Sequence, residues 1–291
     1  MRFAEIGQQL RAYRIESGLR AEEIAARLGV SRAALYRYEK GEVIKLDTVK
    51  RLAELLKVSP LSLLGIGVEY YSRSVGYFER IRQIEESADQ ILQVFGPFAY
   101  LTTSDQFDRT MAEGLAEASE QAPAERAASR AAADQVLGIL ASRKRMYLQR
   151  KPGIIALLSL SSIRAFLDQG LLGGLKLSDT LRQQCRKVAA AEIEHIAGLM
   201  ETEPMGLQFG LLAGPDPSAS FKILRSRDRA MLAVNPFRAD TAPTMQTGVA
   251  MITGADEAVA SHQRVAEAMW RDATKGATAA SRLRAMLGAN A

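Results

Sequence analysis

The chain has 291 residues, of which 47% are hydrophobic and 24% charged, and its formal net charge is +5 at pH 7. This length allows about two domains at ~150 residues each, and the composition is that of an ordinary globular protein. No apolar run approaches the ~20 residues of a membrane span, and the charged residues 1–20 do not resemble a signal peptide. We therefore expect neither a membrane span nor a membrane partner. The single cysteine excludes an internal disulfide, so we expect a cytoplasmic protein.

Positive charge is concentrated in the first 65 residues. They contain 12 Lys and Arg against 8 Asp and Glu, which places +4 of the net +5 in this segment. Residues 66–291 are close to neutral, with 26 basic against 25 acidic residues. A basic head on a near-neutral body is the distribution expected of a module that binds phosphates.

Apolar residues recur at helical spacing in this basic segment and predict five short helices. The predicted helices cover residues 4–17, 21–28, 32–39, 47–56 and 60–64. Gly29 stands at the turn before the third helix, where a residue without a Cβ can adopt a positive φ, and Ser31 follows as N-cap. The third helix carries Arg32, Tyr36 and Arg37 on one face. Two short helices joined in this way are typical of a DNA-binding helix-turn-helix.

Residues 6–64 also resemble a known family. The resemblance is carried by IGQQLRAYRIESGL from residue 6, AEEIAARLGVSRAALYRYEKG from residue 21 and LDTVKRLAELLKVSPLSLL from residue 46. These segments are similar to the Cro/phage-repressor helix-turn-helix family of transcriptional regulators, also called the xenobiotic-response-element (XRE) family. The resemblance implies an all-α, five-helix, lambda-repressor-like domain over residues 1–65 that binds double-stranded DNA.

The resemblance also assigns roles to individual side chains. The implied DNA contacts are to bases from Arg32, Ala33, Tyr36 and Arg37, and to phosphates from Ser31 and Lys40. Arginine can bind guanine O6 and N7 together, and an alanine methyl can meet a thymine methyl. Arg14 and Glu39 match a pair that ties the first helix to the third. Arg20 stands where the family has a capping Ser or Thr, so anchoring is weakened unless Arg20 itself contacts a phosphate.

Residues 66–96 follow a short glycine-containing break and carry one apolar stripe. Its members recur every three or four residues: Tyr71, Val75, Phe78, Ile81, Ile84, Ala88, Ile91 and Phe95. This spacing predicts one connecting helix over about 70–95. The stripe either packs on its own domain or forms the dimer interface that a protein reading two half-sites requires.

Residues 97–291 alternate predicted strands and helices. The predicted strands cover 97–103, 154–160, 206–214, 220–226, 229–237 and 247–253, with a hairpin turn at 226–229. The predicted helices cover 105–119, 124–150, a short segment after 161, 178–201, 255–273 and 277–287. This alternation predicts an α/β domain with a mixed sheet, which binds an effector or mediates oligomerisation.

Polar residues follow several predicted strands and open the helices after them. In open α/β sheets, ligands collect at the carboxyl ends of strands, where helix N-termini offer free N–H groups. The candidate ligand residues at these ends are Thr103, Ser104, Ser161, Ser162, Arg164, Asn235 and Arg238. For any single hydroxyl, an ordinary helix N-cap is the simpler interpretation.

The sequence contains no recognisable motif for catalysis, a metal or a cofactor. Cys185 and two histidines, His195 and His262, are too few for a usual zinc site. Glu192 and His195 have the spacing of carboxylate-bridged metal bundles but lack a second copy of the motif, which favours a solvated helix face. Cys185 lies beside two basic residues that could make it a redox switch, but a half-buried structural thiol is the better interpretation. We therefore do not expect an enzyme.

Together these patterns indicate a transcriptional regulator associated with the bacterial nucleoid. We expect a homodimer that reads an inverted repeat of double-stranded DNA through helix 32–39, with a C-terminal domain that senses a small molecule. The alternative is a constitutive DNA-binding protein, antitoxin-like or a maintenance factor, whose C-terminal domain binds a protein partner. An enzyme with a DNA-targeting head would need clustered ionisable groups, and the sequence shows only scattered ones. For the head, a plain helical hairpin with solvated arginines is disfavoured by the concentration of charge.

Overall fold

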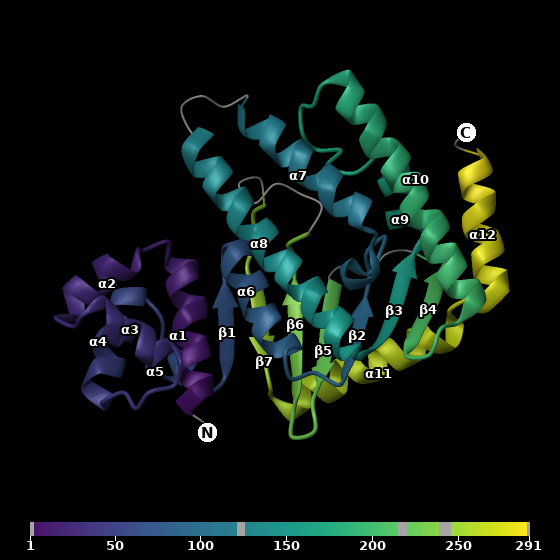
Figure 1. Ribbon diagram of the computed structural model, residues 1–291. Coiled ribbons are helices and arrows are strands. Elements are labelled where there is room, and N and C mark those ends of the chain that lie inside the picture. The colour runs from purple at the N-terminus through teal and green to yellow at the C-terminus, as the bar shows by residue number, and fades with distance from the viewer. Residues whose placement is uncertain (1–2, 121–125, 215–219, 239–245, 290–291) are drawn as a thin grey trace.

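The computed structural model describes residues 3–120, 126–214, 220–238 and 246–289 (Figure 1). It consists of a bundle of short helices, which we call the head (residues 3–65), and a larger α/β part that follows it, which we call the body. The first helix of the head faces the body, next to one edge of its sheet (Figure 1).

The head contains the five helices that the sequence predicts. They are α1 (Phe3–Ser17), α2 (Ala21–Leu28), α3 (Arg32–Glu39), α4 (Leu46–Leu56) and α5 (Pro60–Leu63). Gly29 ends α2 with φ 71°, in the left-handed region that favours glycine. The hydroxyl of Ser31 accepts the backbone N–H of Ala34 at 3.1 Å and caps α3. Ile24 and Leu35 are fully buried, so the apolar pattern that predicted the helices also forms their core.

The body is built on one sheet of seven strands. They are β1 (Val68–Tyr71), β2 (Gln90–Val94), β3 (Gly153–Ser159), β4 (Leu207–Leu212), β5 (Ser220–Arg225), β6 (Ala230–Asn235) and β7 (Ala250–Thr253), in the order β1-β7-β6-β5-β2-β3-β4. Strands β2, β3 and β4 run parallel, and the other neighbours pair antiparallel. The predicted mixed sheet is confirmed. So is the hairpin turn between β5 and β6, where the Ser226 N–H donates to the Arg229 carbonyl at 2.9 Å.

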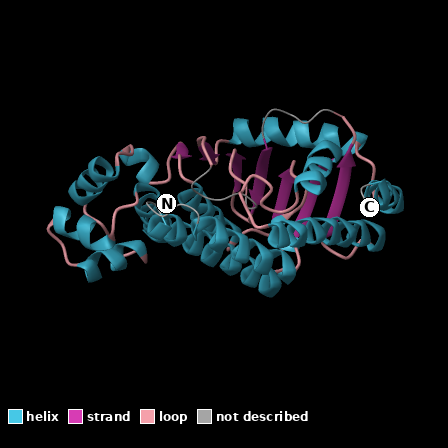
Figure 2. Cartoon of the chain, turned by 90° about the horizontal axis from the view of Figure 1, so that it is seen from above, coloured by secondary structure: helices cyan, strands magenta, loops and turns pink. Residues whose placement is uncertain are grey.

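Helices cover both faces of this sheet. They are α6 (Ser74–Glu85), α7 (Asp105–Glu120), α8 (Arg126–Arg150), α9 (Leu160–Gln169), α10 (Asp179–Thr202), α11 (Asp256–Asp272) and α12 (Gly276–Ala289), with a 3-10 turn η1 (Tyr100–Thr102). Helix α11 packs on one face, and α6, α8 and α10 lie on the other (Figure 2). Helix α12 packs against α10 beside the terminal strand β4.

The predicted continuous helix over 70–95 is wrong. This segment forms β1, α6 and β2 in succession, and its two strands pair with β7, β5 and β3. The apolar spacing of three or four residues resembled a helix because α6 does form the middle of this segment. At both ends the chain is extended instead, because it pairs with strands that are distant in the sequence. Phe78, Ile81 and Ile91 are buried within the body. The stripe therefore packs on its own domain, the first of the two alternatives.

The predicted strand over 97–103 is also wrong, because the chain turns there. Gly96 has φ 134°, and Pro97 lacks the N–H that strand pairing would need. The side-chain amide of Gln93 donates to the Phe98 carbonyl at 2.9 Å and holds the turn before η1 begins. Phe98 and Tyr100 of this segment form part of the wall of a cavity.

Helix α1 joins the head to the body. The rings of Tyr13 and Tyr71 stack with their centroids 5.3 Å apart. A carboxylate oxygen of Glu16 accepts the backbone N–H groups of Ser72 and Arg73, at 2.6 and 3.0 Å, just before α6. The buried side chains of head and body belong to one continuous core. The head is therefore docked on the body and not merely tethered to it.

Candidate DNA interface and a cavity in the body

Helix α3 has an exposed face made of the residues expected to contact DNA. Its inner residues Ala34, Leu35 and Glu39 are buried, and they fix which side of the helix faces the core. The exposed residues on and beside α3 are Ser31, Arg32, Ala33, Arg37 and Lys40. Tyr36 is half-buried at the border of this face. The basic side chains at positions 32, 37 and 40 therefore lie together on the surface of the head.

Acidic side chains hold the two arginines of this face. Arg32 forms a salt bridge with Glu22 at 2.7 Å and donates to the Tyr36 hydroxyl at 3.2 Å. Arg37 pairs with Glu42 at 2.9 Å. The four charged side chains are 50–59% exposed, and exposed pairs contribute only about 0.2–1 kcal/mol. Each guanidinium can therefore exchange its glutamate for a base or phosphate at little cost.

An ion pair anchors α3 to α1. Arg14 donates from Nε and Nη2 to the two carboxylate oxygens of Glu39, at 2.5 and 3.1 Å. The two side chains are 16% and 4% exposed, so the pair faces the interior of the head. Although burial opposes it, the hydrogen bond and charge of Glu39 raise the pKa of Arg14. The pair fixes the angle at which α3 is presented.

The start of α2 lacks the capping hydroxyl usual at this position. Instead, the carboxylate of Glu23 accepts the backbone N–H of Arg20 at 3.1 Å, which is one half of a capping box. The Arg20 side chain is exposed and takes no part in this bond. It is therefore free of a capping role and can contact a phosphate.

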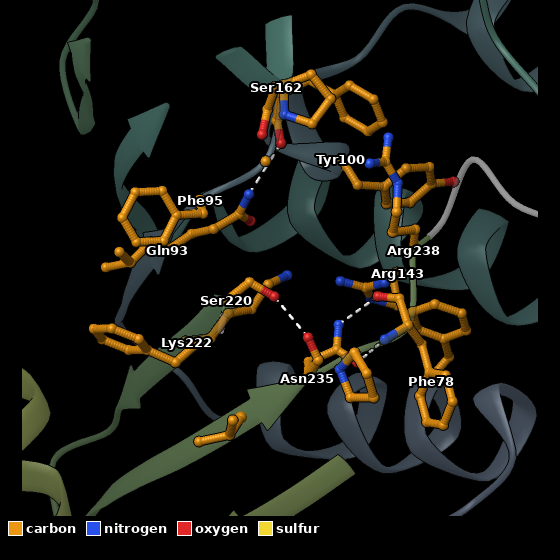
Figure 3. A pocket seen from close by; sticks show the side chains of 18 of the residues that line it. Phe78, Gln93, Phe95, Tyr100, Arg143, Ser162, Ser220, Lys222, Asn235 and Arg238 are labelled. Atoms are coloured by element: carbon orange, nitrogen blue, oxygen red, sulfur yellow. Dashed lines mark hydrogen bonds between the residues drawn. The ribbon is translucent and has the colours of Figure 1, made fainter. Parts of the chain in front are cut away.

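A cavity of about 490 Å³ opens at the sheet edge where β2 and β6 end and β5 begins (Figure 3). Of the candidate ligand residues, Ser162, Asn235 and Arg238 line it. Its other notable lining residues are the aromatic Phe78, Phe95, Phe98, Tyr100, Phe221 and Phe237, and the cations Arg143 and Lys222. Small-molecule sites usually measure about 300–1,000 Å³, so the cavity is large enough for a metabolite.

Thr103 and Ser104 do not line this cavity. They precede α7, where the backbone N–H of Ser104 donates to the Glu192 carboxylate at 3.2 Å. The Thr103 hydroxyl donates to the Tyr100 carbonyl at 2.9 Å. Glu192 is buried, so the expectation of a solvated helix face is wrong for this residue. Its carboxylate fixes the start of α7 against α10.

Ser161 and Arg164 also lie outside the cavity. The Ser161 hydroxyl shares a hydrogen bond of 2.8 Å with the Ser159 hydroxyl at the end of β3. Arg164 is exposed on α9. The structure therefore does not bring Ser161, Arg164 and Arg238 together around one ligand, and only part of the candidate set shares a site.

Cys185 is buried in α10 and not half-buried. Burial, together with the carboxylates of Glu113 and Glu117, raises the pKa of its thiol to about 11. A thiol with this pKa is protonated at neutral pH and therefore a poor nucleophile. The structural role fits Cys185, and the redox switch does not.

A buried charge cluster beside the cavity was missed from the sequence. Arg143 of α8 donates two hydrogen bonds to Glu85 of α6, at 2.7 and 2.8 Å, and both side chains are almost fully buried. Burial and the charge of Arg143 lower the pKa of Lys222 on β5 to about 8. One signal was present in the sequence. Lys222 stands between Phe221 and Ile223, which pack toward α11, so the strand alternation turns the lysine to the opposite, helix-covered face.

Comparison with known proteins identifies the head. Residues 5–63 match a family described as a helix-turn-helix domain. Residues 5–63 are a helix-turn-helix domain. Within it, α2 and α3 are the two helices of the motif, and the exposed face of α3 lies on the second.

One curated relative matches a stretch of this chain that is longer than the helix-turn-helix domain. A Pyrococcus horikoshii protein, provisionally named as an HTH-type transcriptional regulatory protein, is 31% identical over 123 residues. The match covers 38% of this chain and 38% of the relative, so it spans well under half the length of either. Because it is longer than the helix-turn-helix domain, part of it falls in the body.

Among solved structures, the chain shows a weak likeness to TrmBL2, an archaeal chromatin protein. The sequence identity is 12% and the TM-score 0.34, over 79% of this chain and 61% of that chain. In the part of the chain that the structure describes, no helix combines the length and apolar character needed to cross a membrane. The same residues contain no group of three His, Cys, Asp or Glu side chains placed to hold a metal ion.

Proposed function

We propose that this chain is a sequence-specific DNA-binding transcriptional regulator that reads double-stranded DNA through α3. The observation that carries the proposal is the exposed face of α3 in a helix-turn-helix domain, from which Arg32 and Arg37 project. In such domains the second helix of the motif lies in the major groove. The regulator name of the Pyrococcus horikoshii relative supports the same function.

The regulator acts as a homodimer on an inverted repeat in this proposal. A recognition helix of 8 residues reads only a few base pairs. Two half-sites about 34–36 Å apart supply the specificity that one copy lacks. Two-fold pairing is also the commonest arrangement of homo-oligomers.

The body senses a small molecule in the cavity at the sheet edge. The alternative, a body that binds a protein partner, would be favoured by an exposed apolar groove. A concave cavity with cations and amides among aromatic walls instead supports a small-molecule site. Such a ligand changes DNA affinity only if it favours one arrangement of the head on the body over another.

The test is selection of DNA from a random pool by the full chain, followed by sequencing. The proposal expects one enriched motif with two-fold symmetry, and loss of that enrichment when Arg32→Ala and Arg37→Ala are combined. Arg145→Ala removes an exposed arginine of the body and should select the same motif as the unchanged chain. Selection of no motif, or of the same motif by the double variant, would contradict the proposal.

A further inference from the structure

Lys222 is half-buried, at a position in the middle of the sheet that ordinary packing would give to an apolar residue. On the sheet it pairs in register with Gln93 of β2 on one side and Ala233 of β6 on the other. Its side chain lies on the face covered by α6 and α8, where it lines the cavity with Phe78 and Arg143 (Figure 3). A lysine in such a place loses hydration, and buried charges are usually paired or functional.

The charges around this lysine do not balance among the described residues. Arg143 and Glu85 neutralise each other through their two hydrogen bonds. Within the described ranges, no carboxylate forms a salt bridge with Lys222. The described lining of the cavity holds no aspartate or glutamate, so no carboxylate of this lining offsets the charge of Lys222. A negative charge placed in this cavity would therefore be attracted to it.

The polar groups beside Lys222 are already engaged. The Asn235 side chain accepts the Phe237 N–H at 2.8 Å and donates to the Phe237 carbonyl at 2.6 Å. The Ser220 hydroxyl donates to the Asn235 carbonyl at 2.6 Å. The Lys222 ammonium forms no hydrogen bond with the described residues, so it can donate to a ligand, and the walls around it are mostly aromatic.

We infer that the cavity binds a small organic anion, whose carboxylate or phosphate contacts Lys222 and whose apolar part packs against the aromatic walls. The inference rests on the proposed function, because it names the class of molecule that the body senses. Phe78 and Phe237 offer flat surfaces to an apolar group, and Arg238 adds a cation among the lining residues. A neutral molecule of the same shape would leave the half-buried positive charge of Lys222 uncompensated.

Two fluorescent probes of similar shape separate charge from hydrophobicity. The anion 1-anilinonaphthalene-8-sulfonate stands for the ligand, and neutral N-phenyl-1-naphthylamine serves as its uncharged counterpart. In titrations of the full chain, Lys222→Met should weaken binding of the anion at least tenfold and that of the neutral probe less than twofold. Lys222→Arg should retain anion binding, and Lys176→Met, at an exposed lysine of the body, should change neither.

Two results would overturn the inference. Equal anion affinity in the unchanged chain and in Lys222→Met would place the anion elsewhere. Equal loss of both probes would show that the lysine acts through the shape of the cavity and not through its charge. Competition by benzoate and by phenyl phosphate then separates the two anions: displacement by only one identifies a carboxylate or a phosphate site, and displacement by neither contradicts the inference.

The pH dependence gives a second readout. The charges that act on the Lys222 ammonium are Arg143 of α8, which opposes its charge, and Glu85 of α6, which favours it. Burial raises the pKa of the nearby Tyr100 hydroxyl, so it stays neutral as Lys222 titrates. Affinity for the sulfonate should therefore fall as the pH rises through about 8 in the unchanged chain, and not in Lys222→Met. A flat profile in both would contradict the inference.

DNA affinity separates failure of this inference from failure of the proposed function. If the anion binds but affinity for the selected DNA motif does not change, the anion site is supported and its role in sensing is contradicted. Specific DNA binding with no anion site would keep the regulator and overturn the inference.

Discussion

Arg11 of α1 forms a 2.8 Å salt bridge with Glu79 of α6, and the residue before it, Phe78, lines the cavity of the body. One turn of α6 therefore touches both the head and the proposed effector site. Glu79 is 2% exposed and also binds Arg82, so its carboxylate is held from two sides. If filling the cavity shifts α6, the shift would reach α1 directly through this salt bridge. It would then reach α3 through the Arg14–Glu39 ion pair, which joins α1 to α3.

We expect Glu79→Gln to lower the free energy of unfolding by about 1–3 kcal/mol at pH 7, because it removes a buried charge bound by two arginines. Burial opposes the effect, but Arg82 and Arg11 lower the pKa of Glu79 below its ordinary 4.5. Its ionised form therefore stabilises the fold above that pH, and this contribution is lost as the pH falls through the lowered pKa.

Urea unfolding of the full chain at pH 7 and at about pH 3 measures this effect. The difference between Glu79→Gln and the unchanged chain should shrink at the lower pH. Asp134→Asn, at an exposed position within α8, should leave stability unchanged at both. A difference of the same size at both pH values would show that the carboxylate charge is not responsible.

Replacing Arg32 or Arg37 by Ala should cost about 1–3 kcal/mol on the selected motif and flatten the preference at one base pair. Lys40→Ala should instead weaken binding to the motif and to random DNA by the same factor, and reduce the salt slope by about 1. Fluorescence anisotropy at several salt concentrations measures both effects. Equal losses on motif and random DNA for the arginine variants would assign them to phosphates.

Glu22→Gln should strengthen DNA binding. Glu22 holds Arg32 in the free protein and would face the negative backbone in the complex, so its charge competes with DNA. Loss of an exposed pair of this kind should add about 0.2–1 kcal/mol to the affinity, more at low salt. Anisotropy with the selected motif tests this, with Glu257→Gln as a remote control of the same charge change. Unchanged or weaker binding would mean that Glu22 positions Arg32 for DNA.

The head could be predicted closely because its signals are local. The Gly29 turn, the Ser31 cap and the spacing of apolar residues each act within a turn or two of chain. Residues 70–95 could not be predicted in this way. Their strands are stabilised by pairing with residues far along the chain, such as Tyr71 with Ala250. The local spacing of apolar residues gives no information about these partners.

Of the seven candidate ligand residues, Ser162, Asn235 and Arg238 line the cavity and the other four lie outside it, and binding of a ligand there stays a prediction. Chain order indicates where strands end, whereas it does not show that Glu192 engages the backbone N–H of Ser104. The Arg143–Glu85 pair joins two helices that share no sequence signal. Lys222 could have been found from the sequence. Its neighbours in the strand are apolar, and when they pack toward α11 the lysine between them lies on the opposite, helix-covered face of the sheet.

Glu39→Ala should destabilise the chain by about 3 kcal/mol, because it leaves the largely buried charge of Arg14 without its partner. Combining Arg14→Met with Glu39→Leu replaces the pair by apolar side chains of similar size and should recover most of this loss. Thermal unfolding of the full chain measures both. If Glu39→Ala keeps its melting temperature and changes only the selected motif, the pair reads DNA.

Lys222→Met should stabilise the free protein at pH 7 by up to about 3 kcal/mol, although it removes anion binding. The folded chain lowers the pKa of Lys222 from 10.5 to about 8, so between these values the unfolded chain binds more protons and stability rises with pH. Below about pH 8 the full cost of the half-buried Lys222 charge is present, and by about pH 10.5 it has disappeared.

Urea unfolding of the unchanged chain and of Lys222→Met across this range measures the cost directly. Other titrating groups are shared by the two proteins, so their contributions cancel in the difference. Lys176→Met, at an exposed lysine, should follow the unchanged chain at every pH. Parallel curves for Lys222→Met and the unchanged chain would show that the lysine carries no destabilising charge in the empty cavity. If the unfolding free energies of the two proteins converge toward high pH, the Lys222 charge destabilises the folded chain.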